Sequence, residues 1–445
     1  MMNTPIYDFI KKYASEGKKR LHMPGHKGIG ALGIEQFDIT EIGGADSLYE
    51  AYGIIAESEE NASGIFGCPT FYSTEGSSQC IRAMLYLACI NARSKHEKPL
   101  ILAGRNAHKT FITAAAMLDC EVEWLLPEAD ESYLSCSVHP LRLFNKLKNS
   151  ERLPDAVYIT SPDYLGNISD IGKLAEVCHE FGVPLLVDNA HGAYLKFLPE
   201  SMHPIDLGAD LCCDSAHKTL PVLTGGAYLH ISPDTAFPYE NQAKTALAMF
   251  GSTSPSYLIL ASLDLANAQL SDMGKKLTDI SENVEKSKKM LSQSGFNLRG
   301  NEALKITVCP KSAGFTGYEI ADFCEKNGVI CEFSDADHIV FMFSVNNNSD
   351  DPIEAAKLIL SAERKAPIKT SAPDFHLPEK AMSIRKAAFS TQETIPVEQS
   401  EGRILAVPTV GCPPAVPIAV CGEKIDNETI ERFLYYGITE CTVVR

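Results

Sequence analysis

The chain has 445 residues, a formal net charge of −17 and a hydrophobic fraction of 45%. This length and composition predict a globular protein of two or more domains with a substantial core. The negative charge disfavours nucleic acid and anionic membranes as partners, because both favour a basic protein surface. With no apolar run long enough to cross a bilayer, we expect a cytoplasmic protein.

The N-terminal part of the chain changes character near residue 60. Residues 1–60 contain many glycines and little clear period, so we expect an extended N-terminal arm. Beyond them, helical and strand-like segments alternate, which is typical of an α/β fold with a mostly parallel, doubly wound sheet. The expected strands are residues 99–103, 122–126, 156–160, 184–188, 209–214 and 226–231, and the expected helices are residues 77–92, 107–118 and 172–181.

The second half of the chain is predicted to form smaller domains. Helix-like segments from residue 255 to residue 290 lead into strands expected at 305–308 and 338–344. A Pro-containing stretch, residues 366–378, reads as a linker before a small Pro-rich unit. The predicted domains are a large domain over 61–250, a small α+β domain over 251–365 and a C-terminal domain over 379–445.

The fourteen cysteines are scattered along the chain. No Cys-x-x-Cys pair occurs that would indicate zinc or a redox dithiol. We therefore predict reduced, mostly buried thiols and no metal site.

Two polar segments follow buried strands. Asp188 ends one expected strand and opens the sequence DNAHG, and Ser215–Thr219 (SAHKT) follows the next. Ligands of open α/β sheets bind beyond the carboxyl ends of strands. Pyridoxal phosphate requires a lysine that holds it as an imine and a carboxylate that keeps its ring nitrogen protonated. Lys218 and Asp188 fit these roles, although such an Asp is often a turn cap and a lone Lys is usually a surface charge.

The cofactor's phosphate needs a site that attracts anions. Free amides at the start of the helix expected over 77–92 could provide it, assisted by Gly76, Ser77 and Ser78. A Ser-rich segment is also a common helix cap, which is the simpler interpretation of these residues alone. Ser215 and His217, beside Lys218, could complete the anchor.

A histidine follows another expected strand. His108 comes after the strand at 99–103, so we expect it at the same edge of the sheet. Its flat imidazole could stack on the cofactor ring, although a single His is more often a surface or core residue.

Five blocks of sequence extend this pattern over nearly the whole chain. They resemble the pyridoxal-phosphate-dependent ornithine/lysine/arginine decarboxylase group, which has the aspartate-aminotransferase fold, also called fold type I. The blocks are LHMPGHKG (21–28), DITEIGGADSL (38–48), NAHKT (106–110), DNAHG with SAHKT, and a tail containing SIRKA (383–387), Gly402–Ile404, Pro413–Pro414, Pro417 and Gly422–Glu423.

The resemblance implies a role for each candidate residue. Lys218 would form the imine with the cofactor, and Asp188 would pair with the ring nitrogen. His108 would stack on the ring, with His191 next to it. The phosphate would meet Gly76, Ser77, Ser78, Ser215 and His217. A homodimer or larger assembly is also implied, because the group completes its active site across a dimer interface. The chain resembles the short form of the group, without the N-terminal receiver-like domain.

Several positions depart from the pattern of the group. Asn189 stands where Glu is common, and Ser47 stands where a second Asp is usual. The segment after the lysine, residues 220–226, also differs from the larger enzymes. Further departures lie in the tail, at Cys412, Ala415 and Cys421. These differences leave the cofactor residues intact and bear on the substrate.

The expected reaction is decarboxylation of a basic amino acid, with arginine favoured over lysine and ornithine because short forms are often assigned to polyamine synthesis. Two alternatives remain open. One is an aminotransferase or β-eliminating lyase on the same fold, which would release a keto acid or pyruvate instead of carbon dioxide. The other is a noncatalytic homologue, against which the presence of both Lys218 and Asp188 argues.

Overall fold

The computed structural model describes residues 2–94, 96–128, 131–270, 273–408 and 415–445. These residues divide into two compact units, one of residues 1–91 and 184–275 and one of residues 92–183 and 276–445. The predicted domain limits remain predictions. Cys412, Pro413 and Pro414 of the predicted tail pattern lie outside the described residues.

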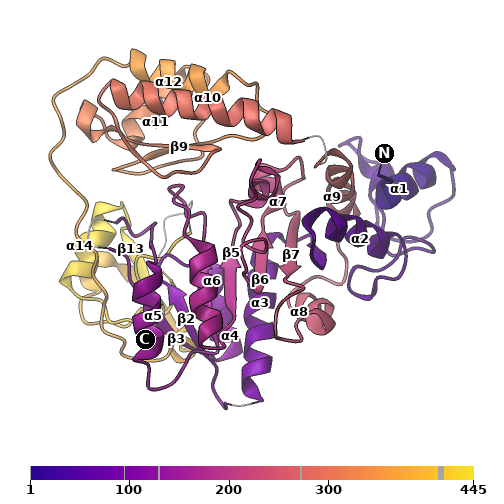
Figure 1. Cartoon of the computed structure of the whole chain (residues 1–445), viewed down its shortest axis with the longest axis horizontal. Coiled ribbons are helices and arrows are strands. Elements are labelled where there is room, and N and C mark those ends of the chain that lie inside the picture. The colour runs from indigo at the N-terminus through magenta and orange to yellow at the C-terminus, as the bar shows by residue number, and fades with distance from the viewer. Residues whose placement is uncertain (1, 95, 129–130, 271–272, 409–414) are drawn as a thin grey trace. The chain divides into compact units, whose positions relative to one another are not determined.

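The first unit carries a set of strands with helices around them (Figure 1). Its strands lie in the order β1-β7-β6-β5. The pair β5–β6 is parallel, whereas β7 is antiparallel to both of its neighbours. Its elements are α1 (Pro5–Ser15), α2 (Ile54–Phe66), β1 (Thr70–Ser73), α3 (Gly76–Arg93), β5 (Leu185–Asp188), β6 (Leu211–Asp214), α7 (Ala216–Thr219), β7 (Ala227–Ile231), α8 (Ala243–Ala248) and α9 (Tyr257–Leu270), with 3-10 helices η1 (Glu35–Phe37), η2 (Leu48–Glu50), η3 (Ala193–Phe197) and η4 (Glu240–Gln242).

The second unit contains three groups of paired strands. Strand β2 pairs in parallel with both β3 and β4, while the sheets β10-β11-β9-β8 and β12-β13 are antiparallel. Its elements are β2 (Leu100–Gly104), α4 (Lys109–Leu118), β3 (Glu121–Leu125), α5 (Pro140–Lys148), β4 (Ala156–Thr160), α6 (Ile171–Glu180), α10 (Met273–Gln293), β8 (Asn297–Arg299), β9 (Lys305–Cys309), η5 (Pro310–Ala313), α11 (Gly317–Lys326), β10 (Phe333–Ser334), β11 (Ile339–Met342), α12 (Asp351–Ser361), α13 (Ile384–Ala388), β12 (Gln392–Pro396), η6 (Val397–Gln399), α14 (Asn427–Tyr435) and β13 (Glu440–Val444).

The strands expected from hydrophobic runs are present. The residues of β2, β5, β6 and β7 are all buried, as expected for strands that are covered on both faces. The parallel pairs confirm the predicted α/β class with mostly parallel strands. Among the described residues, no helix combines the length and the apolar character needed to span a membrane.

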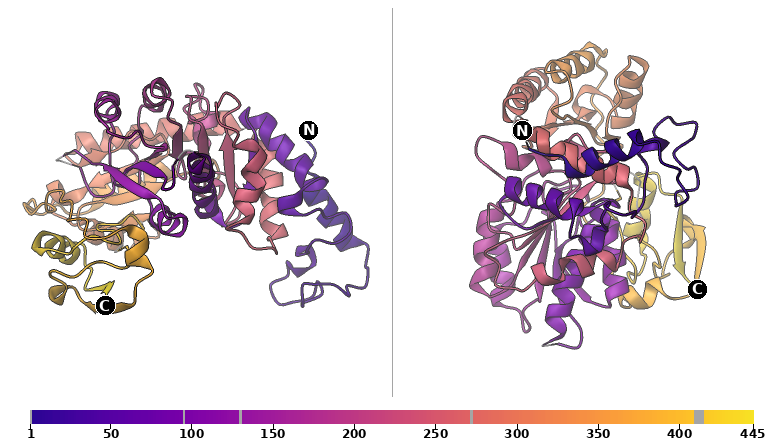
Figure 2. Two further views of the ribbon diagram at one scale, coloured as in Figure 1. Left: turned by 90° about the horizontal axis from the view of Figure 1, so that it is seen from below. Right: turned by 90° about the vertical axis from the view of Figure 1, so that its right-hand side faces the viewer.

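The expected N-terminal arm is only partly extended. Helix α1 buries Ile6 and Ile10, and the carboxylate of Asp264 in α9 accepts the backbone N–H groups of Ile6 and Tyr7 at 3.0 Å. This cap comes from a residue more than 250 positions away, so the local sequence did not reveal it. The segment between α1 and α2 forms a long irregular loop, drawn in indigo in Figure 2.

Within the second unit, the C-terminal segment is attached to the end of β2 by a buried ion pair. Arg105 and Glu423 are 3% and 4% exposed, and Arg105 Nη2 lies 3.0 Å from Glu423 Oε2. The guanidinium also donates to the carbonyls of Pro417 and Ile418, and it lies over the ring of Trp124. A buried charge with this many partners fixes the segment in one position, because moving it would leave the charge unpaired.

Candidate active site

Asp188 ends β5 with its side chain buried, 2% exposed. Its Oδ1 accepts the N–H of Ala190 at 3.2 Å and lies 3.7 Å from the Sγ of Cys213, the residue opposite it on β6. Burial raises the pKa of the Cys213 thiol well above its ordinary value, so the thiol keeps its proton and donates it toward the carboxylate. A carboxylate therefore lies at the carboxyl end of a buried parallel strand, as predicted.

Lys218 lies in the short helix α7, directly after β6. Its Nζ is 2.9 Å from Nε2 of His191, which is 5% exposed and belongs to the segment that follows Asp188. The structure therefore brings the predicted lysine and one predicted histidine into direct contact.

Backbone and side-chain hydrogen bonds fix the turn that carries Lys218. The Lys218 N–H donates to the carbonyl of Ser215, and Nδ1 of His217 lies 3.1 Å from the carbonyl oxygen of Gly226. Burial lowers the pKa of His217, so its neutral imidazole donates this hydrogen bond near pH 7. His217 thus supports the turn by a hydrogen bond to Gly226, the residue directly before β7.

The residues predicted to bind phosphate meet at the start of α3. The hydroxyl of Ser215 donates to that of Ser77 at 2.7 Å, and Ser78 stands in the same first turn. Gly76 has a φ of +72°, which favours glycine, and its N–H donates to the carbonyl of Gly225 at 2.7 Å. The Gly76 amide and the Ser215 hydroxyl therefore already donate hydrogen bonds within the protein, and phosphate binding by this set remains a prediction.

His108 belongs to the second unit, where it follows β2 and caps α4. Its Nδ1 accepts the N–H of Thr110 at 3.1 Å and lies 2.9 Å from the hydroxyl oxygen of Thr110. This bond orients the imidazole at the carboxyl end of a parallel strand, which is where the sequence predicted it. Its stacking role remains a prediction.

The sequence did not reveal a buried group beneath the Lys218 turn. Asp214, the last residue of β6, accepts hydrogen bonds from Asn189, His203 and His230. Asp214 directly precedes Ser215, so its place at the strand end was a usable signal. His203 lies in an irregular segment, and nothing in its sequence context pointed to a partner.

Two groups of side chains among the described residues are close enough to coordinate a metal ion. The first consists of His203, Asp214 and His230, and the second of Asp335, Asp337 and His338. In the first group, hydrogen bonds of 3.2 Å join each imidazole to the carboxylate, so the group is satisfied by its own contacts.

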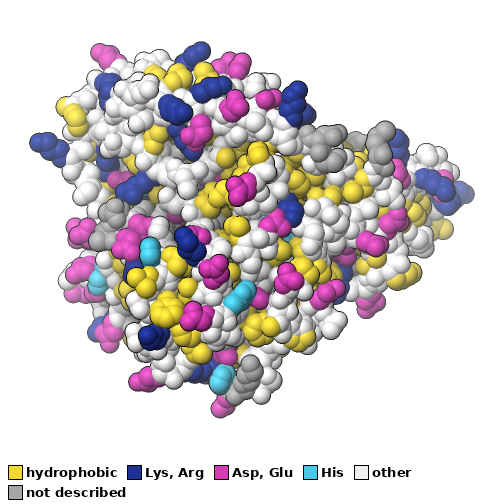
Figure 3. Space-filling model, in the orientation of Figure 1, with side chains coloured by type: hydrophobic (Ala, Val, Ile, Leu, Met, Phe, Trp, Pro, Cys, Tyr) yellow, Lys and Arg dark blue, Asp and Glu magenta, His cyan; other side chains and the backbone are white. Residues whose placement is uncertain are grey.

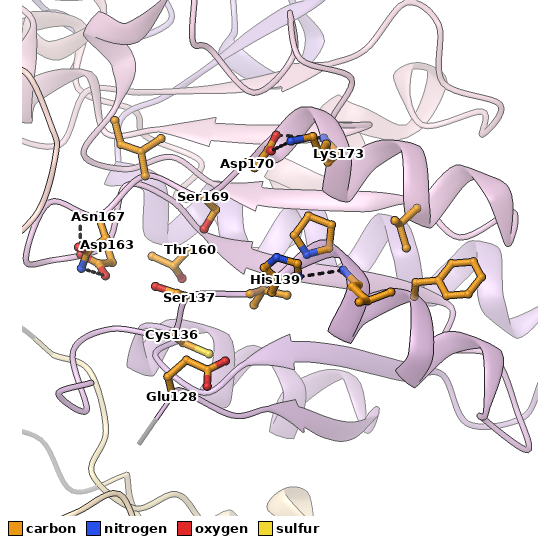
Figure 4. A pocket seen from close by; sticks show the side chains of 16 residues that line it. Glu128, Cys136, Ser137, His139, Thr160, Asp163, Asn167, Ser169, Asp170 and Lys173 are labelled. Atoms are coloured by element: carbon orange, nitrogen blue, oxygen red, sulfur yellow. Dashed lines mark hydrogen bonds and ion pairs between the residues drawn. The ribbon is translucent and has the colours of Figure 1, made fainter. Parts of the chain in front are cut away.

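A large cavity in the second unit lies apart from the predicted residues. It has a volume of about 680 Å³ and opens between the starts of α5 and α6 and the end of β4 (Figure 4). Its labelled polar side chains include His139, Thr160 and Asp170. None of the predicted site residues lines it.

Comparison with known proteins assigns the family. The model of the Orn/Lys/Arg decarboxylase major domain matches residues 4–310, and the model of the family's C-terminal domain matches residues 369–440. The chain belongs to the Orn/Lys/Arg decarboxylase family.

Relatives along the whole chain agree with this assignment. The chain is 30% identical to an arginine decarboxylase of Bacillus subtilis over 96% of its length and 92% of the relative. It is 22% identical to the constitutive lysine decarboxylase of Escherichia coli over 96% of its length and 76% of that protein. The predicted family and enzyme class, an amino-acid decarboxylase, are thereby confirmed.

A solved structure shares the fold. The lysine decarboxylase LdcF of Francisella novicida matches with a TM-score of 0.80 over 99% of this chain and 81% of its own, at 18% identity. This likeness concerns the fold, and it confirms the predicted fold type I architecture.

Proposed function

We propose that this decarboxylase uses pyridoxal phosphate to remove the α-carboxylate of a basic amino acid, with arginine as the favoured substrate. The observation that carries the proposal is the pair Asp188 and Lys218 in a decarboxylase-family chain: Asp188 ends β5, and Lys218 lies in the turn that follows the adjacent parallel strand β6.

The residues present fit the cofactor. When bound, pyridoxal phosphate supplies a ring that accepts the electrons released when the carboxylate leaves the α-carbon. Lys218 offers the amine for the covalent link, and buried Asp188 offers a negative charge that would keep a proton on the ring nitrogen. The paired hydroxyls of Ser77 and Ser215, at the start of an 18-residue helix, suit a phosphate dianion.

His191 is assigned a role at the lysine. Its Nε2 lies 2.9 Å from Lys218 Nζ, which is within reach for direct proton exchange. A neutral imidazole at this distance can accept a proton from the ammonium group and so leave the amine able to react. His108 is proposed to stack on the ring, and His217 to hold the turn that presents Lys218.

Arginine is favoured by the relatives. Several proteins 28–30% identical over nearly the whole chain are arginine decarboxylases of Bacillus species and of Halalkalibacterium halodurans. The net negative charge suits a cationic substrate, and Figure 3 shows acidic side chains interspersed with basic ones over one face of the molecule.

A homodimer or larger assembly is also proposed. The loop between α1 and α2 exposes large apolar side chains, including Leu21 (92% exposed), Ile29 (82%) and Leu32 (80%). Apolar side chains gathered on one projecting segment favour contact with another protein surface. The cytoplasmic location stays a prediction.

The first test replaces the proposed cofactor lysine. Lys218→Ala is expected to abolish carbon dioxide release from labelled arginine while retaining noncovalent cofactor binding. Borohydride reduction of the wild-type enzyme, followed by peptide mapping, should label Lys218. The control Lys173→Ala removes an exposed lysine of α6 and should retain full turnover.

The same assay decides between substrates and reactions. Arginine, lysine and ornithine, each labelled at the carboxylate, should rank with arginine highest. Undiminished turnover by Lys218→Ala, or a label on another lysine, would refute the assignment. A keto acid or pyruvate as the product would instead place the chain among aminotransferases or β-eliminating lyases.

A further inference from the structure

A fully buried carboxylate lies next to the turn that carries Lys218. Asp214 is 0% exposed and directly precedes Ser215. Its Oδ1 accepts a hydrogen bond from Nδ2 of Asn189 at 2.7 Å. Its Oδ2 lies 3.2 Å from Nε2 of both His203 and His230. The Cys212 thiol, 3.7 Å from Oδ1, is a fourth and weaker neighbour beside these three nitrogen donors.

These donors come from different parts of the first unit. Asn189 directly follows Asp188 at the end of β5, His230 is in β7, and His203 lies between η3 and β6. The backbone strengthens the link to β5, because the Asn189 N–H donates to the carbonyl of Cys213 at 3.0 Å. The hydrogen bond between Asn189 and Asp214 therefore links the segment that carries Asp188 to the turn that carries Lys218.

The cluster of Asn189, Asp214, His203 and His230 contains one carboxylate, and its other members stabilise the negative charge of that carboxylate. Burial alone would raise the pKa of Asp214, but the two imidazoles more than offset this and hold it below its usual range. Burial lowers the pKa of His230, so this imidazole stays neutral and donates through Nε2. The surroundings thus supply hydrogen-bond donors to a single ionised carboxylate.

The Asn189 side chain is closely packed in its place. A Cβ atom added at Gly192 would lie 2.0 Å from Asn189 Oδ1, so the glycine leaves space for this amide. An acid at position 189 would bring a second carboxylate within hydrogen-bonding distance of the first, and the two negative charges would repel each other in a buried site. The amide of Asn189, directly after β5, and the acid of Asp214, at the end of β6, are therefore matched.

We propose that Asp214 is a positioning residue that, through Asn189, fixes the Asp188 carboxylate relative to Lys218. This inference rests on the proposed function, since both of these residues are assigned to the cofactor. The Asn189–Asp214 pairing itself does not require the cofactor. It also accounts for the departure at position 189, where the decarboxylase group commonly has Glu.

The test exchanges the two side chains in the full-length chain. Asn189→Asp creates two facing carboxylates, and it should lower the thermal midpoint of the cofactor-free protein by about 5–10 °C. Its dissociation constant for pyridoxal phosphate, measured by absorbance titration, should rise about tenfold or more. Adding Asp214→Asn restores one acid and one amide, so the double variant should recover most of both losses.

A matched control uses the other end of the same strands. Asp210 is 3% exposed, and it accepts the N–H of Leu185 at 2.8 Å and the hydroxyl of Thr235 at 2.6 Å. Asp210→Asn should lower the thermal midpoint but leave cofactor affinity within about twofold of the wild type. This contrast separates positioning from general destabilisation.

Three results would overturn the proposal. In the first, Asn189→Asp binds the cofactor as tightly as Asp210→Asn does. In the second, the double variant shows the sum of the two single losses. In the third, the purified wild type holds stoichiometric metal that Asp214→Asn lacks, which would make the group a metal site.

A second variant tests the proposal if Asn189→Asp does not fold. If Asn189→Asp is not recovered folded, Asn189→Ala removes only the amide donor and should still weaken cofactor binding about threefold. Unchanged affinity in that variant would also overturn the proposal. If the wild type binds no pyridoxal phosphate, the proposed function fails. The thermal midpoints of Asn189→Asp and of the double variant with Asp214→Asn still decide whether Asn189 and Asp214 are matched.

Discussion

Two buried aspartates at the ends of neighbouring strands are assigned different tasks by their surroundings. Asp188 has the N–H of Ala190 and the thiol of Cys213 beside it, both uncharged donors. Asp214 has two imidazoles and an amide, which stabilise its charge inside the protein. The imidazole and amide donors satisfy the Asp214 carboxylate within the protein, whereas the task proposed for Asp188 is to pair with the protonated ring nitrogen of the cofactor.

Asp188→Asn should leave the lysine chemistry intact while removing the charge. We expect turnover to fall on the order of 10²- to 10³-fold, because the amide cannot stabilise a protonated ring nitrogen. Borohydride should still label Lys218. The exposed helix cap Asp170→Asn serves as the control, and turnover should remain normal. Equal turnover by Asp188→Asn and Asp170→Asn would contradict the role of Asp188.

At the scale of elements, contacts between distant segments determine which helices form. Helix α1 packs on α9, and the Asp264 carboxylate in α9 caps it while also accepting the hydroxyl of Ser58 at 2.6 Å. Burial raises the pKa of Asp264 from 3.8 to about 6, although Ser58 and the backbone N–H groups of Tyr7 and Ile6 oppose the shift. Docking of α1 is therefore coupled to a titrating group.

The sign of this coupling can be measured. The folded protein binds the proton of Asp264 more tightly than the unfolded chain does. Protonated Asp264 therefore makes a contribution to the free energy of unfolding that is fully present below about pH 4. It is lost as the pH rises toward 6, and amounts to about 2–3 kcal/mol. Relative to Asp264→Asn, the wild type should therefore lose stability between pH 4 and pH 6.5.

Thermal midpoints at the two pH values measure this difference. The variant Asp279→Asn, at an exposed position of α10, is the control and should follow the wild type at both values. A wild type that parallels Asp264→Asn across this range would show that Asp264 does not titrate there.

At the scale of the whole molecule, the loop between α1 and α2 exposes several large apolar side chains. Tyr52 near its end is 90% exposed, in addition to the leucines and isoleucine already named. Exposing large apolar side chains to water is unfavourable in free energy, and burial against another chain would remove this unfavourable contribution. The proposed assembly would therefore depend on this loop.

Replacing Ile29 and Leu32 together with Asp should lower the molar mass measured by light scattering toward that of a single chain. The control is Ile330→Asp, at an isolated apolar position of the second unit that is 83% exposed. This control should keep the wild-type mass. An unchanged mass for the loop variant would remove this loop from the proposed interface.

Local patterns predicted much of the fold. The buried strands, and the three helices that were expected between them, appear within two residues of their expected limits, because apolar runs and period-2 or 3.6 patterns are local properties. Helix α1 and the short edge strand β1 are among the elements that the sequence did not predict. Their stability comes from Asp264 and from pairing with β7, both distant in sequence.

For the site, the sequence by itself determined the chemistry that is proposed. Lys218, Asp188 and the serines at the start of α3 follow strands or open a helix, and a sheet brings such ends together whatever its details. Only the tertiary structure decided the supporting contacts: His191 on the lysine, Gly225 on the Gly76 amide, and the donors around Asp214. Such contacts depend on which side chains packing brings within about 3 Å, and spacing along the chain does not encode that distance.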